Sequence, residues 1–101
     1  MQQSHRATVL SLAGELDLAS SPTLEAELER AAAEDPPRLV LDMRELTFMD
    51  STGVRTIVTA HQAAQDEGVE LRLVRPDAGS AVWRVIEISG IDGALGLVDA
   101  P

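Results

Sequence analysis

The chain has 101 residues, the usual size of one domain with a single hydrophobic core. Its 17 acidic residues outnumber its 8 arginines, and lysine is absent, so the net charge is −9. This charge argues against sequence-independent binding of nucleic acid and against docking on anionic lipid, since both need a cationic face. The absence of cysteine excludes disulfides, thiolate metal sites and a cysteine nucleophile.

Nothing in the sequence indicates a membrane or secretory protein. No apolar run approaches the ~20 residues of a membrane-spanning helix, and the polar residues 1–6 lack the pattern of a signal peptide. We therefore expect a cytoplasmic protein. Internal repeats, low-complexity tracts and linkers are also absent. The sequence predicts one domain over residues 1–101, with a core from about residue 7 to residue 98.

Several segments have the composition of β-strands. Residues 7–12 are rich in apolar and β-prone residues and predict a strand. Residues 15–18 alternate polar with apolar side chains, which fits either a second strand or a continuation of the first past a glycine bend. Residues 38–43 contain a continuous apolar run, typical of a strand buried on both faces of a parallel sheet, and we expect a turn at 44–45. A last strand is predicted at 69–74.

Apolar residues at helical spacing predict three helices. The first begins at Ser20 or Ser21, either of which offers an N-cap oxygen, and ends at a pair of prolines. The second ends at Gly68 and the third at Gly90, because glycine suits the left-handed residue that closes a helix. Residues 91–98 have room for a helical turn and a short edge strand.

The order of these elements predicts the fold class. Strands that alternate with helices indicate an α/β domain with a mostly parallel sheet, because each crossover returns the chain to the same end of the sheet. The two candidate N-terminal strands are expected to pair antiparallel, which would make the sheet mixed. We therefore predict a single α/β domain with a mixed, mostly parallel β-sheet flanked by helices.

The most informative segment is Asp50-Ser51-Thr52-Gly53, where an apolar strand runs into polar side chains and a helix follows at once. One interpretation is structural: Ser51 or Asp50 caps the helix, which contributes about 1 kcal/mol. The other is functional. A serine hydroxyl at a helix N-terminus is reachable from solvent, and phosphorylation there adds nearly two negative charges without melting the helix. The two interpretations are compatible.

Carboxylates and histidines are the candidate catalytic or metal-binding groups of this sequence. Asp17 follows a predicted strand, and loops at the carboxyl ends of parallel strands gather at one edge, so Asp17, Asp50 and Ser51 are expected to meet there. An enzyme that used Asp17 and Asp50 is the weakest hypothesis, because the sequence has no nucleophile–base pair or cofactor motif. His5 and His61 have no neighbour at metal-ligand spacing. We predict a protein that is not an enzyme and holds no cofactor or metal.

Acidic residues are concentrated between residues 15 and 35, where seven carboxylates and one arginine give −6. This segment is either a solvated surface that aids solubility or an electrostatic guide that speeds association with a basic partner.

Three segments resemble the STAS domains, and within them the anti-anti-sigma factors (anti-sigma factor antagonists) of bacteria. They are residues 12–19 with Gly-Glu-Leu-Asp, residues 39–53 ending in Asp-Ser-Thr-Gly, and residues 68–92 ending in Ser-Gly-Ile-Asp. The resemblance covers about residues 7–98 in the family's order. It implies a mixed sheet flanked by helices and a regulatory function.

The resemblance also implies a mechanism. A typical member binds an anti-sigma factor that is also a serine kinase, and binding releases the sigma factor. The kinase phosphorylates the serine after the motif aspartate, which is Ser51 here, and the modified form dissociates until a PPM-type phosphatase restores it. ATP and magnesium belong to the partner, so no cofactor is expected in this chain. The residues implied in partner binding, beside phosphorylation at Ser51, are Asp17, Asp50, Ser51, Thr52, Gly53 and Arg55.

One position departs from the family pattern, and one function competes. The family usually continues with leucine and a second glycine, where Val54 and Arg55 stand here. Arg55 lies one turn past Ser51, so it either covers the helix surface that a partner uses or pairs with a phosphate on Ser51. The alternative function is a non-catalytic STAS subunit of a lipid-transport or stress-signalling assembly. The acidic charge favours a monomer, and a weak dimer through a sheet edge is the alternative.

Overall fold

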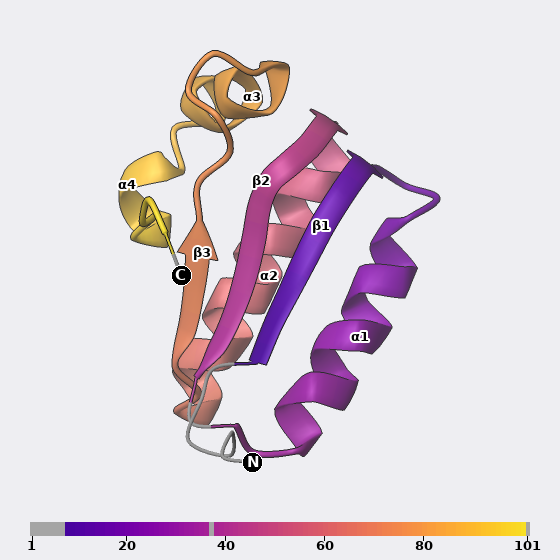
Figure 1. The fold of residues 1–101 in the computed structure, drawn as a ribbon, viewed down its shortest axis with the longest axis vertical. Coiled ribbons are helices and arrows are strands. Elements are labelled where there is room, and N and C mark those ends of the chain that lie inside the picture. The colour runs from indigo at the N-terminus through magenta and orange to yellow at the C-terminus, as the bar shows by residue number, and fades with distance from the viewer. Residues whose placement is uncertain (1–7, 37, 101) are drawn as a thin grey trace.

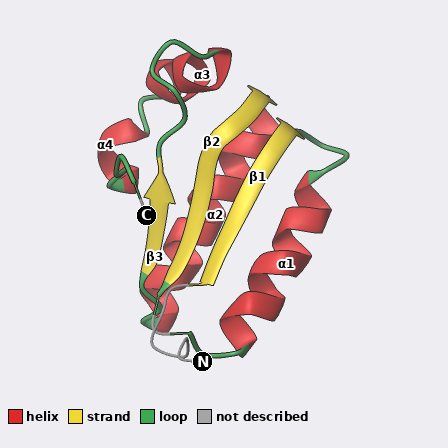
Figure 2. Ribbon diagram, viewed as in Figure 1, coloured by secondary structure: helices red, strands yellow, loops and turns green. Residues whose placement is uncertain are grey.

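The computed structural model describes residues 8–36 and 38–100. In chain order its elements are β1 (Thr8–Leu16), α1 (Ser21–Ala33), β2 (Leu39–Met49), α2 (Ser51–Glu67), β3 (Leu71–Val74), α3 (Ala81–Ser89) and α4 (Asp92–Leu95). The strands form one layer with α1 and α2 side by side on one face (Figure 1). Figure 2 shows α3 at the end of the sheet where β2 finishes and α4 beside β3. The predicted alternation of strands and helices is confirmed.

The sheet has the order β1-β2-β3, and both neighbouring pairs are parallel. A parallel bridge between Val74 and Val98 extends the β3 edge, so the short edge strand expected near the end of the chain is reduced to a single bridge. The predicted α/β class is confirmed, but the antiparallel pair that would make the sheet mixed is not found within residues 8–36 and 38–100. β2 and β3 are each reached through a helix, and such crossovers bring neighbouring strands in parallel.

The two candidate N-terminal strands are one strand. β1 continues through Gly14, whose φ of +82° lies in the left-handed region that glycine adopts at little cost. The register of β1 against β2 shifts on the far side of this glycine, between Gly14 and Glu15. The alternative of a continued strand is therefore confirmed, and no hairpin is available to pair antiparallel within the described ranges.

The turn expected at residues 44–45 is wrong, because β2 runs unbroken from Leu39 to Met49. The Asp42 carboxylate accepts hydrogen bonds from the Arg44 backbone N–H at 3.0 Å and from the Arg44 guanidinium at 2.7 Å. The register against β1 shifts beside this pair, between Ser11 and Ala13. The polar residues thus mark an irregularity inside a strand. Pairing of β2 with β1 before and after this point outweighs the local tendency of residues 44–45 to form a turn.

Both ends of α2 and the carboxyl end of α3 follow the predicted chemistry, whereas the cap at the start of α3 was not predicted. The Asp50 carboxylate accepts a hydrogen bond from the first turn of α2, and the Ser80 hydroxyl does the same for α3. Gly68 and Gly90 close the two helices in the left-handed conformation, with φ of 71° and 72°. Each helix is therefore fixed at both ends by residues that the sequence makes recognisable.

The core lies between the sheet and the α1–α2 pair. Leu41 and Met43 of β2 are fully buried there with Ile57 of α2, and Leu24 of α1 joins them. Val40, on the opposite face of β2, is also fully buried. The continuous apolar run is thus buried on both faces, as predicted, and it anchors the strand whose end carries the Asp50–Gly53 segment.

Candidate functional site

The carboxyl ends of β1 and β2 lie next to each other. Leu16 is the register partner of Met49, and the Asp50 N–H donates a hydrogen bond to the Leu16 carbonyl at 3.3 Å. Asp17 and Asp50 each follow one of these paired residues, and Ser51 comes next along the chain. The prediction that the three residues meet at one edge of the sheet is confirmed. We call this edge the rim, defined as residues 17–20 together with residues 50–55.

Asp50 caps α2. Its backbone is extended, and its Oδ1 accepts a hydrogen bond from the Gly53 N–H at 3.0 Å. Its carbonyl also accepts the Val54 N–H at 3.0 Å. Of the two residues that the sequence offered for capping, Asp50 therefore takes the role, which leaves the Ser51 side chain without a part in starting the helix.

Ser51 is the first residue of α2 and is exposed. Its hydroxyl has no hydrogen-bond partner among residues 8–36 and 38–100. The next residue, Thr52, is half-buried, and its carbonyl accepts the Thr56 hydroxyl at 2.9 Å. The rim therefore presents a serine hydroxyl, unused by the described part of the chain, at the positive end of a 17-residue helix.

Gly53 allows α2 to approach the end of β1. A Cβ atom added there would lie 2.5 Å from the Leu16 carbonyl oxygen and 2.8 Å from the Met49 Cγ. Both distances are shorter than real contacts, and the first is to backbone, so a side chain would push α2 away from the sheet. Gly53 is buried, so what it contributes at the rim is the close contact that fixes the first turn of α2, which carries Ser51, against the end of β1.

Asp17 organises the turn between β1 and α1. Its Oδ1 accepts hydrogen bonds from the backbone N–H groups of Ala19 at 3.1 Å and Ser20 at 3.0 Å. The Ser20 hydroxyl lies 2.8 Å from the Glu15 carbonyl and accepts the Asp17 N–H at 2.9 Å. Ser20 thus closes the turn and makes no side-chain cap on α1, so the expected cap is wrong.

A hollow of about 240 Å³ separates the first turns of α1 and α2. Its walls include Leu18 from the turn, Ser21 and Glu25 from α1, and Thr52 and Arg55 from α2. Leu18 is 74% exposed, which is unusual for so large an apolar side chain. Ser21 is only 4% exposed, and its hydroxyl has no hydrogen-bond partner in the part of the chain that the structure describes.

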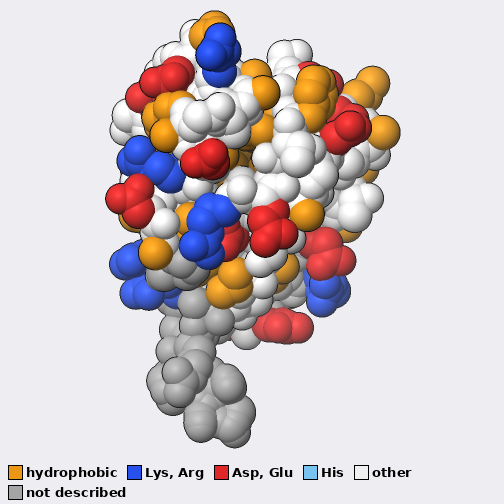
Figure 3. Space-filling view, turned by 45° about the horizontal axis from the view of Figure 1, so that its top comes forward, with side chains coloured by type: hydrophobic (Ala, Val, Ile, Leu, Met, Phe, Trp, Pro, Cys, Tyr) orange, Lys and Arg blue, Asp and Glu red, His pale blue; other side chains and the backbone are white. Residues whose placement is uncertain are grey.

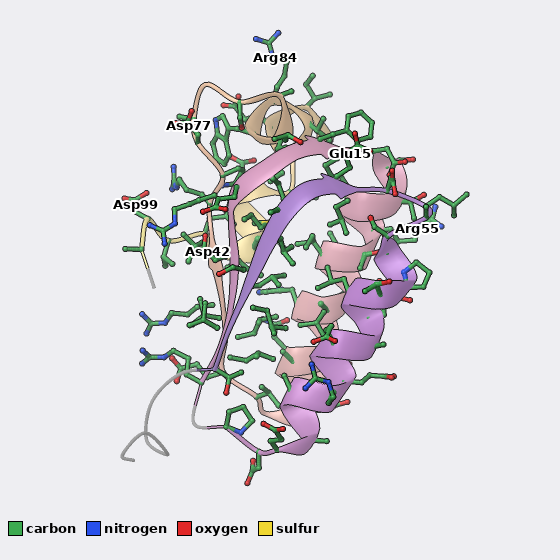
Figure 4. All side chains as sticks on the ribbon, turned by 45° about the vertical axis from the view of Figure 1, so that its right-hand side comes forward. Glu15, Asp42, Arg55, Asp77, Arg84 and Asp99 are labelled. Atoms are coloured by element: carbon green, nitrogen blue, oxygen red, sulfur yellow. The ribbon has the colours of Figure 1, made fainter. Side chains whose placement is uncertain are left out.

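The arginines differ in whether an acidic side chain holds them. Five pair with a carboxylate: Arg30 with Glu27, Arg38 and Arg72 with Glu70, Arg44 with Asp42, and Arg75 with Asp99. Arg55 and Arg84 have no ion pair within residues 8–36 and 38–100. Figure 4 shows Arg55 at the rim and Arg84 on α3, pointing away from each other. A cation that no described carboxylate holds therefore stands one helical turn from Ser51.

The exposed surface around the rim is mixed in character. Phe48, two residues before Asp50, is 45% exposed and adds an apolar side chain to that of Leu18. Figure 3, which brings the upper end of the molecule forward, shows hydrophobic side chains beside acidic ones on this surface. Apolar groups bordered by polar ones are typical of protein contact surfaces.

Within residues 8–36 and 38–100, no group of three or more His, Cys, Asp or Glu side chains is placed to hold a metal ion. His61 is half-buried on α2, and His5 lies outside the described residues. Over the same described ranges, no helix has the length and apolar character needed to cross a membrane.

The residues of the rim differ in how readily the sequence identifies them. Asp17, Asp50 and Ser51 could be found because they follow strand ends. Leu18 carried only a weak signal, an apolar residue in a turn. The hollow, with the buried Ser21 hydroxyl, had none, because it depends on how two helices far apart in the sequence approach each other.

Comparison with known proteins defines the class. The chain matches the STAS domain over residues 1–98 and belongs to that family. It is 32% identical over 84 residues to the anti-sigma-F factor antagonist RsfB of Mycobacterium tuberculosis, a match that covers 83% of this chain and 66% of that relative's length. It is 30% identical to the anti-sigma-B factor antagonist of Listeria monocytogenes, over 83% of this chain and 72% of the relative.

A solved structure gives the same placement. The anti-sigma factor antagonist from Mycobacterium paratuberculosis superposes with a TM-score of 0.78 and 26% identity, covering 93% of this chain and 78% of that one. Within the STAS family, the chain therefore belongs with the anti-sigma factor antagonists. These relatives are regulatory proteins, in agreement with the prediction that the chain is not an enzyme.

Proposed function

We propose that this protein binds an anti-sigma factor with serine-kinase activity in the cytoplasm, so that a sigma factor is released, and that phosphorylation of Ser51 ends the binding. A PPM-type phosphatase would restore the binding form. The observation that carries the proposal is the Ser51 hydroxyl, which is exposed at the first residue of α2 and is not used by the fold within the described ranges. The names of the relatives support the anti-sigma factor as the partner.

The modification is compatible with the fold. The γ-phosphoryl group of ATP would be transferred to the Ser51 Oγ, which loses its proton, and ADP would leave. The phosphate would lie at the positive end of α2, where negative charge is favourable. Because Asp50 supplies the cap, the helix start does not depend on the Ser51 hydroxyl. The modified protein should therefore stay folded.

The same phosphate would oppose a complex. Ser51 follows Asp50 directly, so a partner that covers the rim would enclose a phosphate beside a carboxylate. Removing two like charges from water costs several kcal/mol unless each gains a partner. Phosphorylation would therefore act by releasing the partner rather than by unfolding the protein.

The proposed contact surface is centred on the rim. Asp17, Asp50, Ser51, Thr52 and Arg55 would face the partner, and Gly53 would position them from below. Leu18 would contribute an apolar contact. Glu25 of α1 lines the hollow beside this surface. The acidic segment between residues 15 and 35 remains compatible with both sequence-based hypotheses, a solvated surface and an electrostatic guide.

A pull-down from host lysate tests the function. Ser51→Ala and Ser51→Asp baits are compared with ATP present, and retained proteins are identified by mass spectrometry. The matched control adds Ser89→Asp to the Ser51→Ala bait, which places the same charge on an exposed serine of α3 while position 51 cannot be phosphorylated. The proposal predicts a kinase-type anti-sigma factor that is retained by the Ser51→Ala bait with or without Ser89→Asp and lost from the Ser51→Asp bait.

The opposite result would favour the alternative function. If the Ser51→Ala and Ser51→Asp baits retain the same transporter or scaffold protein, and ATP makes no difference, the chain is a non-catalytic STAS subunit. Ser51 would then be an unmodified residue at the start of a helix that Asp50 caps.

A further inference from the structure

Arg55 is an exposed arginine at the rim that has no ion pair within residues 8–36 and 38–100. The chain has about twice as many acids as bases, and five arginines are held by carboxylates. Two carboxylates lie near Arg55. Asp50 directs its Oδ1 to the Gly53 N–H, and Glu25 lines the same hollow without an ion pair to Arg55. The guanidinium is therefore exposed beside acids that do not hold it.

The helix geometry places Arg55 over Ser51. Residues four apart in a helix are neighbours on one face, with Cβ atoms about 5–6 Å apart. Helical side chains also tilt toward the N-terminus, so the longer side chain at the later position covers the earlier one. Both Ser51 and Arg55 are exposed, so no packed side chain prevents the guanidinium from reaching the Ser51 Oγ.

Some hydrogen-bond donors at the start of α2 and in the hollow already have an acceptor within the chain, and others have none in the described ranges. The Gly53 and Val54 N–H groups are bonded to Asp50. A phosphate on Ser51 would therefore meet only part of the usual set of helix N-terminal amides. The Arg55 guanidinium offers a planar fork that matches two phosphate oxygens. The buried Ser21 hydroxyl, on the wall that Arg55 shares, has no partner in the described ranges. This combination points to an anionic ligand with several oxygens.

We propose that Arg55 holds the phosphoryl group of phosphorylated Ser51 within the same chain. This inference rests on the proposed function, since it concerns the modified form of that site. Phosphorylation would then change the rim twice, by adding a dianion and by drawing the Arg55 cation away from the partner. Arg55 would act as a positioning residue for the phosphate. Its single charge leaves the phosphate dianion and the Asp50 carboxylate with a net negative charge, so a partner would still be opposed, and it would also lose the Arg55 cation as a contact.

The test uses protein that carries phosphoserine at position 51 by genetic encoding, so no kinase is needed. ³¹P NMR follows the second ionisation of the phosphate with pH in the unmutated chain, Arg55→Gln and Arg84→Gln. The Arg84 variant is the matched control, because it removes an exposed arginine that also has no ion pair in the described ranges. Glu25 and the carboxylates of Asp17 and Asp50 are common to all three proteins.

Pairing with a cation favours the dianion. We therefore expect Arg55→Gln to raise the pKa of the phosphate above that of the unmutated chain, and Arg84→Gln to leave it unchanged. The Arg55 Nε–H resonance should also move on phosphorylation, and Arg55→Lys should shift the pKa less than Arg55→Gln does. An equal pKa in the unmutated and Arg55→Gln proteins overturns the inference, and so does an equal shift in both arginine-to-glutamine variants.

The outcome separates this inference from the proposed function. If the phosphate pKa is insensitive to Arg55 while Ser51→Asp still abolishes capture of the anti-sigma factor, the switch stands and the pairing is wrong. If the phosphate pKa depends on Arg55 but no anti-sigma factor is captured, the pairing stands and the function is wrong.

Discussion

The two ends of the parallel sheet use their charged side chains differently. At the amino-terminal end, Glu70 lies between two arginines, with its Oε2 2.8 Å from the Arg38 Nε and 3.3 Å from the Arg72 guanidinium. At the carboxyl-terminal end, Asp17 and Asp50 accept hydrogen bonds from backbone N–H groups, and Arg55 extends into solvent. The charged side chains pair with one another at the amino-terminal end, whereas at the carboxyl-terminal end the carboxylates bond to backbone and Arg55 has no ion pair within residues 8–36 and 38–100.

This difference separates residues that fix the fold from residues that are available for binding. The carboxylates of the rim hold the turn and the helix start, so their positions are rigid. The Ser51 hydroxyl and the Arg55 guanidinium lie on that rigid frame and contribute little to it. A switch needs such an arrangement, because its charge can change while the frame persists.

The largest expected effect is that of Gly53→Ala. The new Cβ meets the Leu16 carbonyl oxygen at 2.5 Å, so α2 must move or the backbone must strain. We expect a loss of about 2 kcal/mol or more in the free energy of unfolding, measured by urea denaturation. Gly93→Ala is the control, because a Cβ there meets nothing within 4 Å. Equal stability of the two variants would contradict the close approach at the rim.

A smaller effect is expected at the helix cap. Asp50→Ala removes the acceptor of the Gly53 N–H and should cost about 1 kcal/mol. Ser51→Ala should change the free energy of unfolding by less than about 0.5 kcal/mol, because the hydroxyl is exposed and has no partner in the described residues. Thermal denaturation of the two variants makes the comparison. A larger loss in Ser51→Ala would mean that the serine has a structural function.

Much of this arrangement could be predicted from the sequence, because it depends on local patterns. Apolar runs and glycines marked the strands and helix ends, and residues after paired strand ends must share an edge. The sequence left the continuity of β1 past Gly14 as one of two alternatives and wrongly predicted a turn inside β2, because pairing between the strands overrides the local bend signals at Gly14 and Arg44. The hydrogen bond that Ser20 makes could not be predicted either, because its hydroxyl can reach the Glu15 carbonyl only in the folded turn.

The smallest expected effect concerns the amino-terminal end. The hydrogen bond from Arg38 is the main cause that holds the pKa of Glu70 below its ordinary value of 4.5. Since the folded pKa is the lower one, the Glu70 carboxylate stabilises the fold above pH 4.5, and this contribution is lost as the pH falls through the folded pKa. Arg38→Gln should therefore weaken the loss of stability on acidification below pH 4.5, measured by urea denaturation.

Two comparisons complete this prediction. Arg84→Gln removes the same charge without touching Glu70, so it should keep the acid dependence of the unmutated protein. Identical acid profiles for the unmutated and Arg38→Gln proteins would show that the amino-terminal pairs are not formed in solution. Neither variant should alter partner capture, because neither position belongs to the rim.

The central claim is that phosphorylation at Ser51 releases a partner and leaves the fold intact. Its most direct test is calorimetry of the captured anti-sigma factor with two forms of this protein, unmodified and carrying phosphoserine at position 51, alongside the melting temperature of each form. We predict that the phosphorylated form binds about a hundredfold or more weakly, because a partner would have to enclose a phosphate dianion beside the Asp50 carboxylate, and that it melts at the same temperature. Equal affinities, or a phosphorylated form that is already unfolded, would contradict the claim.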